Sequence, residues 1–394
     1  MSLSSNSSDF MNKCADNMAD LLYKNVICPY CFKQLNYKKI KKYCNICGNE
    51  VKTNFLQNLF RKIPQCGQNG CLGFATELLC PECKKKLPTD YLLYKKYLSF
   101  CLLGVTGSGK SNFLTVMLNE LMENQDSLWI PSALEEETQV RFSSDRKKLY
   151  ENKTTLEASP AGVPPFPLLW RIRDKKKMSG NKIPTYSLAI FDGAGEDCSK
   201  VDPKISNYIK DSRTLFILLD PTTLTCVKEQ IGNSVSFKNS KIANIGIDAS
   251  LEMINKLTDY IRSNCDFNPD QLIDKDVAVI FTKFDLIKNM FGESGAAIVT
   301  RESKHLKKGA FDKSDADAVD AEIRDWLIRN NENKFVNAIE TNFKKEKVRF
   351  FGVSSFGTAP DENGKIDDIN PDRILDPFIW MLWKEGLVEE IRCS

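Results

Sequence analysis

The chain has 394 residues, 42% of them hydrophobic, which is enough for two or three domains with buried cores. Its net charge of +3 conceals an asymmetry, because residues 1–96 carry 15 Lys and Arg against 7 Asp and Glu, whereas the remainder is mildly acidic. No segment has the roughly 18 consecutive apolar residues of a membrane-spanning helix, and residues 1–9 lack a secretory signal pattern. We therefore expect a cytoplasmic protein with a disordered lead at 1–20 and no membrane partner.

Eight of the 14 cysteines lie between residues 28 and 83, in four closely spaced pairs. The spacings are C-x₂-C-x₁₂-C-x₂-C and C-x₄-C-x₈-C-x₂-C, and the residues are Cys28, Cys31, Cys44, Cys47, Cys66, Cys71, Cys80 and Cys83. Such pairs form turns whose thiolates converge on tetrahedral Zn²⁺, and four thiolates per ion indicate structural sites. We predict a double zinc ribbon at 21–90 with two Zn²⁺, rather than a redox or iron–sulfur unit. Sequential pairing is the simplest assignment, and a nested or cross-braced pairing stays open.

The predicted ribbons also contain basic and aromatic residues close together. The lysines are Lys38, Lys39, Lys41, Lys42 and Lys84 to Lys86, and the aromatic residues are Tyr30, Phe32, Tyr37 and Tyr43. This mixture can bind nucleic acid, but zinc ribbons also bind protein partners or only stiffen a connection. All three roles stay open, with a protein partner favoured.

An apolar strand at 97–103 leads into Gly104-Val105-Thr106-Gly107-Ser108-Gly109-Lys110-Ser111, which matches G-x-x-x-x-G-K-[ST] at every fixed position. A helix is predicted at 110–124 directly after it. In this context backbone N–H groups cradle phosphates at the helix N-terminus. Lys110 would contact the β- and γ-phosphates and Ser111 would ligate Mg²⁺. The motif predicts binding of a nucleoside triphosphate.

From residue 97 onward, apolar runs rich in β-formers alternate with helical patterns, which favours an α/β fold with a mostly parallel sheet. We predict six strands, at 97–103, 167–173, 186–191, 214–219, 277–282 and 348–353. We predict helices at 110–124, 201–211, 249–264, 316–330, 333–346 and 377–390, the last with Asp376 as N-cap and Pro377 as its first residue.

Three of these strands end in polar motifs. Strand 186–191 runs into Asp192-Gly193-Ala194-Gly195, a D-x-x-G pattern whose Asp192 can hold Mg²⁺ through water while the Gly195 N–H meets the γ-phosphate. Strand 277–282 ends in Thr282-Lys283-Phe284-Asp285, where Asp285 can accept two hydrogen bonds from guanine but not from adenine. Strand 348–353 ends in Ser354-Ser355, where a backbone N–H would contact the guanine oxygen.

Taken in order, these motifs resemble the P-loop GTPases of the translation-factor-related (TRAFAC) class over residues 97–392. The resemblance implies a three-layer, Ras-like G domain at 97–394 that binds GTP or GDP with Mg²⁺, with insertions at about 125–165 and 286–315. The implied nucleotide contacts are Gly104, Thr106, Gly107, Ser108, Gly109, Lys110, Ser111, Asn112, Asp192, Gly195, Thr282, Lys283, Asp285, Ser354 and Ser355. With the double zinc ribbon, the chain also resembles zinc-ribbon GTPases encoded in bacterial defence gene clusters.

Several features depart from that pattern. Glu196 stands where Ras-like proteins carry a water-orienting glutamine, so we expect slow or partner-activated hydrolysis, with Lys110, Gly195 and Glu196 as the catalytic groups. The threonine that completes the Mg²⁺ site is ambiguous, with Thr154, Thr155 and Ser159 as candidates, of which Thr155 and Ser159 would lie nearest the nucleotide.

Two segments of the sequence are candidates for contact with a partner. Insertion 286–315 holds the only histidine, His305, which we interpret as solvated surface, with a partner-binding loop as the alternative. Helix 377–390 begins with an all-apolar run, so we favour a helix that packs one face on the sheet and the other on the zinc ribbons or another subunit.

Two functions follow. One is a GTP-hydrolysing switch that contacts a protein partner through the ribbons, switch loops or C-terminal helix. The alternative is a zinc-ribbon adaptor for protein or nucleic acid that binds GTP with little turnover.

Overall fold

The structure is a computed structural model. It describes residues 26–35, 40–52, 63–88, 90–124, 126–157, 167–180, 182–192, 208–231, 247–264, 268, 270–292, 295–305 and 309–391. The expected lead at 1–20, most of helix 201–211, Ser159, Gly195 and Glu196 lie outside these ranges. Among the described helices, none combines the length and the apolar character needed to cross a bilayer.

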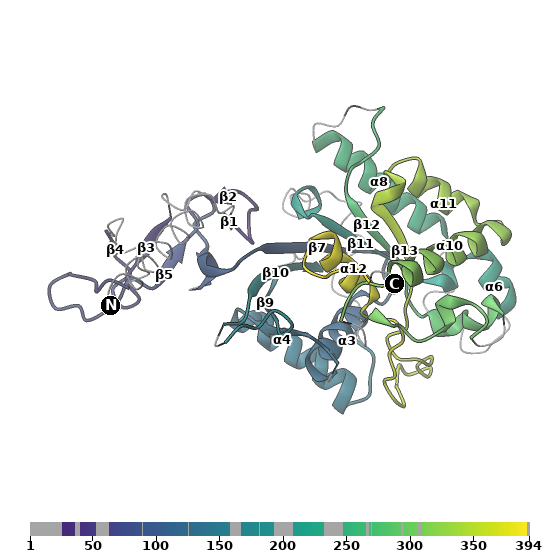
Figure 1. Ribbon diagram of the computed structural model, residues 1–394, viewed down its shortest axis with the longest axis horizontal. Helices are drawn as coiled ribbons and strands as arrows, with labels where there is room; N and C mark the ends of the chain where they lie inside the picture. The colour runs from purple at the N-terminus through teal and green to yellow at the C-terminus, as the bar shows by residue number, and fades with distance from the viewer. Residues whose placement is uncertain are drawn as a thin grey trace, which may run out of the picture. The chain divides into compact units, whose positions relative to one another are not determined.

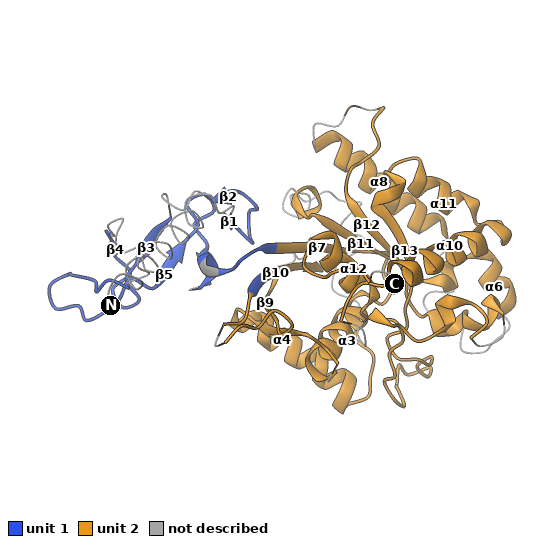
Figure 2. Ribbon diagram, viewed as in Figure 1, with its two compact units in different colours: residues 1–97, 185–187 blue, residues 98–184, 188–394 orange. Residues whose placement is uncertain are grey.

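The chain divides into two compact units (Figure 2). The smaller comprises Met1–Tyr97 with Thr185–Ser187, and the larger comprises Leu98–Pro184 with Leu188–Ser394.

The smaller unit is built from short antiparallel strands. β1 (Val26–Ile27) pairs with β2 (Gln34–Leu35), and a four-stranded sheet has the order β4-β3-β5-β6. Its strands are β3 (Lys41–Tyr43), β4 (Glu50–Val51), β5 (Glu77–Leu79) and β6 (Lys86–Leu87). The loops that join these strands carry the cysteine pairs.

The larger unit is organised on a seven-stranded sheet with the order β13-β12-β11-β7-β10-β9-β8 (Figure 1). The strands are β7 (Tyr97–Leu103), β8 (Trp129–Ala133), β9 (Leu168–Asp174), β10 (Thr185–Asp192), β11 (Thr214–Leu219), β12 (Asp276–Phe281) and β13 (Val348–Gly352). β11 runs parallel to both β7 and β12, and β12 runs parallel to β13. The predicted α/β fold of a P-loop domain is confirmed.

The sheet has one strand more than the six predicted. β8 lies at the edge of the sheet and pairs antiparallel with β9, with Pro131 opposite Ile172. A proline cannot donate to a strand ladder, and therefore it argues against a central strand and is tolerated at an edge. That proline concealed β8 in the sequence.

Helices surround the sheet (Figure 1). They are α3 (Lys110–Glu123), α4 (Glu136–Arg146), α6 (Thr225–Ile231), α8 (Ile247–Asn264), α10 (Lys313–Arg329), α11 (Asn333–Glu340) and α12 (Asp376–Lys384). The predicted helices 110–124, 249–264 and 316–330 correspond to α3, α8 and α10, whereas α4 and α6 were not predicted. Helix 333–346 ends early, at Glu340.

The C-terminal helix differs from the expectation in its length, cap and environment. α12 ends at Lys384 and its N-cap is Leu375, so Asp376 is already helical. Its residues 378–382 are all buried, and Trp380 packs edge-on against Phe351 of β13 at 5.8 Å. The apolar run is therefore buried within this chain and packs on the sheet of the larger unit, so the prediction of a face reserved for another subunit was wrong. A contact of this helix with the zinc ribbons stays a prediction.

β7 lies at the centre of the sheet, and this position determines where a ligand can bind. Phe100 of β7 stacks on Phe216 of β11 with ring centroids 4.4 Å apart, so the strand is anchored in the core. From β7 the chain continues to β8, β9 and β10 on one side, and β11, β12 and β13 lie on the other. Ligands of open α/β sheets bind beyond the carboxyl end of the strand at such a switch point. The loop that follows Leu103 occupies this place.

Candidate nucleotide and metal sites

The glycine-rich loop between β7 and α3 has a backbone that other residues could not adopt easily. Gly107 and Gly109 have φ of +84° and +81°, and Gly109 is the N-cap of α3. A Cβ on Gly104 would lie 2.6 Å from Ser108 Oγ and 2.7 Å from the carbonyl oxygen of Leu218. The loop is therefore a tight cradle at a helix N-terminus, which suits a phosphate group.

Lys110 is buried and lies over this loop. Its ammonium group donates to the carbonyl oxygen of Gly104 at 2.7 Å and to that of Val105 at 3.3 Å. Thr106 is half-buried in the same loop. The positive charge is thus held at the phosphate cradle by backbone oxygens.

Asp192, the last residue of β10, meets the loop from the neighbouring strand. Its Oδ2 accepts from Ser111 Oγ at 3.5 Å and from the guanidinium group of Arg141. Its Oδ1 is buried and has no hydrogen-bond partner in the described structure. A buried carboxylate oxygen without a partner beside a serine hydroxyl fits a hard cation such as Mg²⁺ or one of its bound waters. The residues present therefore fit the predicted metal.

The base-reading motif contacts the phosphate loop directly, although the two are more than 170 residues apart in sequence. Thr282 Oγ1 donates to the carbonyl oxygen of Ser108 at 2.8 Å. Lys283 Nζ donates to the carbonyl oxygen of Gly107 at 3.1 Å and pairs with Asp220 at 2.5 Å. Lys283 adopts a left-handed φ of +52°, an unusual conformation for a lysine that is frequent at functional turns. The fold therefore joins both motifs in one site.

Asp285 is held by the loop that follows β13. Its Oδ1 accepts from Ser354 Oγ at 2.6 Å, and Ser354 Oγ in turn accepts from the Gly357 N–H at 2.8 Å. Burial raises the pKa of Asp285 above its usual value, although the hydrogen bond from Ser354 opposes this shift. Ser355, the next residue, is half-buried. The structure thus brings together the predicted aspartate and the predicted serine loop.

Two of the residues proposed to complete the Mg²⁺ site, Thr154 and Thr155, lie in the described segment 126–157. The Thr155 N–H donates to the carbonyl oxygen of Gly364 at 2.8 Å, and the Leu156 N–H donates to Asn112 Oδ1 at 3.0 Å. Asn112 follows Ser111, so this segment passes the N-terminal turn of α3. Within the described ranges, neither Thr154 nor Thr155 donates a hydrogen bond to Asp192, and their proposed role in the Mg²⁺ site stays a prediction.

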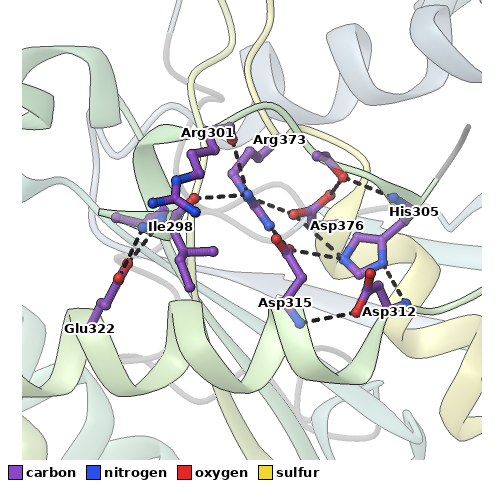
Figure 3. Close-up of polar contacts among 10 residues, drawn as sticks. Ile298, Arg301, His305, Asp312, Asp315, Glu322, Arg373 and Asp376 are labelled. Atoms are coloured by element: carbon purple, nitrogen blue, oxygen red, sulfur yellow. Dashed lines mark hydrogen bonds and ion pairs between the residues drawn. The ribbon is translucent and has the colours of Figure 1, made fainter. Parts of the chain in front are cut away.

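A buried ionic network supports the loop that carries Ser354, and the sequence did not reveal it (Figure 3). Arg373 pairs with Asp315 of α10 and donates through Nε to Asp376 of α12 at 2.8 Å. His305 is only 1% exposed, so its interpretation as solvated surface was wrong. Its Nδ1 accepts from the Asp312 N–H at 2.9 Å.

The same network explains why its acidic groups need no metal ion. His305 Nε2 lies 3.8 Å from each of the two carboxylates, and the three residues have the composition of a metal site. The guanidinium group of Arg373, however, already supplies the cation that two buried carboxylates need. We interpret this cluster as a structural ion network. It adjoins the base site because Asp372, next to Arg373, exchanges backbone hydrogen bonds with Ser354 at 3.0 and 2.9 Å.

The eight ribbon cysteines form two groups of four. The outer tetrad is Cys28, Cys31, Cys80 and Cys83, and the inner tetrad is Cys44, Cys47, Cys66 and Cys71. This is the nested arrangement, so the simpler sequential pairing was wrong. The reason is strand direction: β3 and β5 are antiparallel, and therefore Cys44 after β3 and Cys80 after β5 lie at opposite ends of the sheet.

The sulfur positions fit zinc. Sγ–Sγ distances are 3.7 Å for Cys28–Cys83 and Cys31–Cys80, 3.6 Å for Cys44–Cys71 and 3.4 Å for Cys47–Cys66. Four sulfurs at about 2.3 Å around a tetrahedral ion would lie about 3.8 Å apart, whereas a disulfide needs about 2 Å. A Cβ on Gly73 would lie 2.3 Å from Cys44 Sγ, so only glycine leaves room for the inner site.

Hydrogen bonds favour the thiolate, which is the metal-binding form, at one cysteine of each tetrad, whereas burial raises the pKa of Cys83. A hydrogen bond from the Cys28 thiol lowers the pKa of Cys31 to about 5. In the inner tetrad, the backbone N–H of Cys47 lowers the pKa of Cys44 to about 6. Hydrogen bonding therefore stabilises the ionised form of one sulfur in each tetrad.

Comparison with known proteins gives similarities of fold only. No protein-family model matches the chain, and no curated protein sequence matches it. Solved structures similar to it include the S. cerevisiae Ski7 GTPase-like domain bound to GTP, with 17% identity and a TM-score of 0.30 over 76% of this chain and 52% of that one. The chain thus spans about half the length of the Ski7 structure. Another is the signal recognition particle receptor SRb-GTP/SRX complex from Chaetomium thermophilum, with 12% identity and a TM-score of 0.29 over 68% of this chain and 96% of that one.

Proposed function

We propose that the chain is a guanine-nucleotide-binding switch that binds GTP with Mg²⁺ and hydrolyses it to GDP. The observation that carries the proposal is the direct contact of Thr282 and Lys283 with the phosphate loop, which sets Asp285 at the same sheet edge as Lys110. A site with this arrangement can hold phosphates and read the base together.

Each side chain has a defined part in this proposal. The Gly104–Ser111 loop and Lys110 bind the phosphates, and Asp285, held by Ser354, accepts the guanine N–H groups. Ser111 and Asp192 would hold Mg²⁺, which supplies charge neutralisation at the phosphates when bound. Gly195 and Glu196 are proposed to face the γ-phosphate and the attacking water.

Single-turnover hydrolysis tests the enzymatic part. The full chain, loaded with GTP and then supplied with Mg²⁺, should convert GTP to GDP, slowly because Glu196 replaces the water-orienting glutamine. Tight GTP binding with no conversion would leave the alternative function, an adaptor that binds GTP with little turnover.

The zinc ribbons are proposed to contact a protein partner. Around the inner tetrad, Ile46, Leu72 and Phe74 are 69%, 76% and 47% exposed, and we name these three residues the ribbon tip. They are neighbours, since a Cβ on Gly73 would lie 3.1 Å from Ile46 Cβ. Exposed apolar side chains held by a rigid metal site are typical of protein contacts.

Three of the described lysines of the ribbons are engaged in contacts within the ribbons. Lys41 pairs with Glu50 and Lys86 pairs with Glu77, both at 2.6 Å. Lys85 lies over the Tyr30 ring, 4.9 Å from its centroid, and therefore covers a face that a base could stack on. These contacts favour the protein partner.

The resemblance to zinc-ribbon GTPases of bacterial defence clusters extends the proposal to anti-phage defence. The expected partner is then a protein of the same gene cluster that binds the GTP-loaded form more tightly than the GDP-loaded form. Changing Ile46 and Leu72 to serine should weaken that binding without changing nucleotide affinity. Equal binding of both nucleotide forms would contradict a switch.

A further inference from the structure

Helix α4 places an arginine beside the candidate metal site. The helix is fixed on β9, because Phe142 packs edge-on against Trp170 at 5.2 Å and Thr138 Oγ1 accepts from the Leu169 N–H at 3.0 Å. Arg141, which precedes Phe142, extends from this fixed helix to the end of β10 and pairs with Asp192.

The two oxygens of Asp192 have different surroundings. The carboxylate side chain is fully buried, and its Oδ2 takes the hydrogen bonds from Arg141 and Ser111. Its Oδ1 is buried without a partner in the described structure. Arg141 also lies 3.8 Å from Asp145, one turn further along α4, which holds its guanidinium group from the other side.

We propose that Arg141 is a positioning residue of the Mg²⁺–nucleotide site. By donating to Oδ2, it fixes the rotation of the Asp192 carboxylate, which is otherwise a broad torsion, and leaves Oδ1 directed to the cation. Residues that orient a metal-binding group in this way commonly change metal affinity by about 10- to 100-fold when removed. This inference rests on the proposed function, because it assigns Asp192 to Mg²⁺.

The positive charge of Arg141 could also have the opposite effect on Mg²⁺ binding. A guanidinium group close to the site repels a divalent cation, so if charge outweighed orientation, removing Arg141 would tighten Mg²⁺ binding. The direction of the change therefore decides between the two.

Three variants of the full chain provide the test: Arg141→Ala, Arg141→Lys and the matched control Arg146→Ala. Arg146 lies on the same helix and contacts Asn119 Oδ1 at 2.7 Å and Glu123 at 3.3 Å, but not Asp192. The control therefore removes the same charge from α4 without touching the site.

The measurement is the Mg²⁺ concentration that half-saturates binding of a fluorescent, non-hydrolysable GTP analogue, together with the analogue's affinity in EDTA. We expect Arg141→Ala to raise the half-saturating Mg²⁺ by about 10- to 100-fold, while its EDTA affinity stays within about threefold of wild type. Arg141→Lys should fall between wild type and Arg141→Ala, and Arg146→Ala should match wild type.

If the half-saturating Mg²⁺ concentration of Arg141→Ala is unchanged or lower than that of the wild type, the inference about Arg141 is overturned. The proposed function would still be supported in that case, provided that the wild type binds the GTP analogue. An equal loss of affinity with and without Mg²⁺ would overturn it too, because that is the signature of a purely structural role. If Arg141→Ala does not fold, Arg141→Lys with wild-type Mg²⁺ dependence would overturn it. A wild type that binds no guanine nucleotide would refute the proposed function itself.

Discussion

The buried network around Arg373 offers a prediction whose size follows from the structure. The Arg373 side chain is 1% exposed, and the carboxylates of Asp315 and Asp376 that it joins are 7% and 4% exposed. It also donates to the carbonyl oxygens of Ile298 and Arg301 at 3.3 and 3.0 Å. Arg373→Ala would leave two buried carboxylates without their cation, and breaking a buried pair costs about 3–5 kcal/mol.

The assay is urea unfolding of the full chain, followed by the fluorescence of its five tryptophans, two of which, Trp380 and Trp383, lie in α12. Arg146→Ala is the matched control, because Arg146 pairs with Glu123 at 3.3 Å and the two side chains are 37% and 62% exposed. An exposed pair of this kind contributes only about 0–1 kcal/mol. The variant should therefore lose several times more free energy of unfolding than the control.

A companion variant isolates the charge. Adding Asp315→Asn and Asp376→Asn to Arg373→Ala removes both unpaired carboxylates, and part of the lost stability should return. Equal losses for Arg373→Ala and Arg146→Ala, or no recovery in the triple variant, would refute the reasoning that paired buried charge stabilises this region. If Arg373→Ala does not fold, the recovery of folding in the triple variant is the informative result.

Four further predictions concern the sites. Asp285→Asn should shift preference from guanine to xanthine nucleotides. The binding free energy of GDP, measured by calorimetry, should weaken by about 3–6 kcal/mol, because two charge-assisted hydrogen bonds are lost. Unchanged GDP affinity would contradict the base assignment. Because burial raises the pKa of Asp285, and only its ionised form accepts the guanine N–H groups, GDP affinity should fall on acidification at a pH above that at which an exposed aspartate titrates. Gly73→Ala should lower the zinc content from two ions per chain toward one by elemental analysis, since the outer tetrad is untouched and serves as internal control. Lys110→Ala should abolish triphosphate binding, whereas Lys313→Ala, which breaks an exposed pair with Asp317, should not.

Local sequence patterns were enough to predict six of the seven sheet strands and the motifs at the strand ends. Six strands were predicted because buried parallel strands appear as apolar runs, and each polar motif directly follows such a run. β8 was missed because Pro131 argues against a strand and is allowed only at an edge. Helix α4, with Arg141, lies in what was predicted only as an insertion at about 125–165.

Features that depend on distant contacts could not be predicted. Nested zinc pairing follows from the antiparallel arrangement of β3 and β5, which the cysteine spacing does not encode. His305 was taken for surface because its neighbours in sequence are lysines, yet its Nδ1 is bound by the Asp312 N–H and its ring stacks on Phe311 at 5.2 Å. Likewise, the apolar run of α12 packs on the sheet of the larger unit.

Calorimetric titration of the full chain with GDP and with ADP, in the presence of Mg²⁺, tests the central claim most directly. The account predicts that GDP binds more tightly than ADP by a factor on the order of 10³ or more, because adenine would leave the Asp285 carboxylate unpaired at the base site. Equal affinities for the two nucleotides would contradict it.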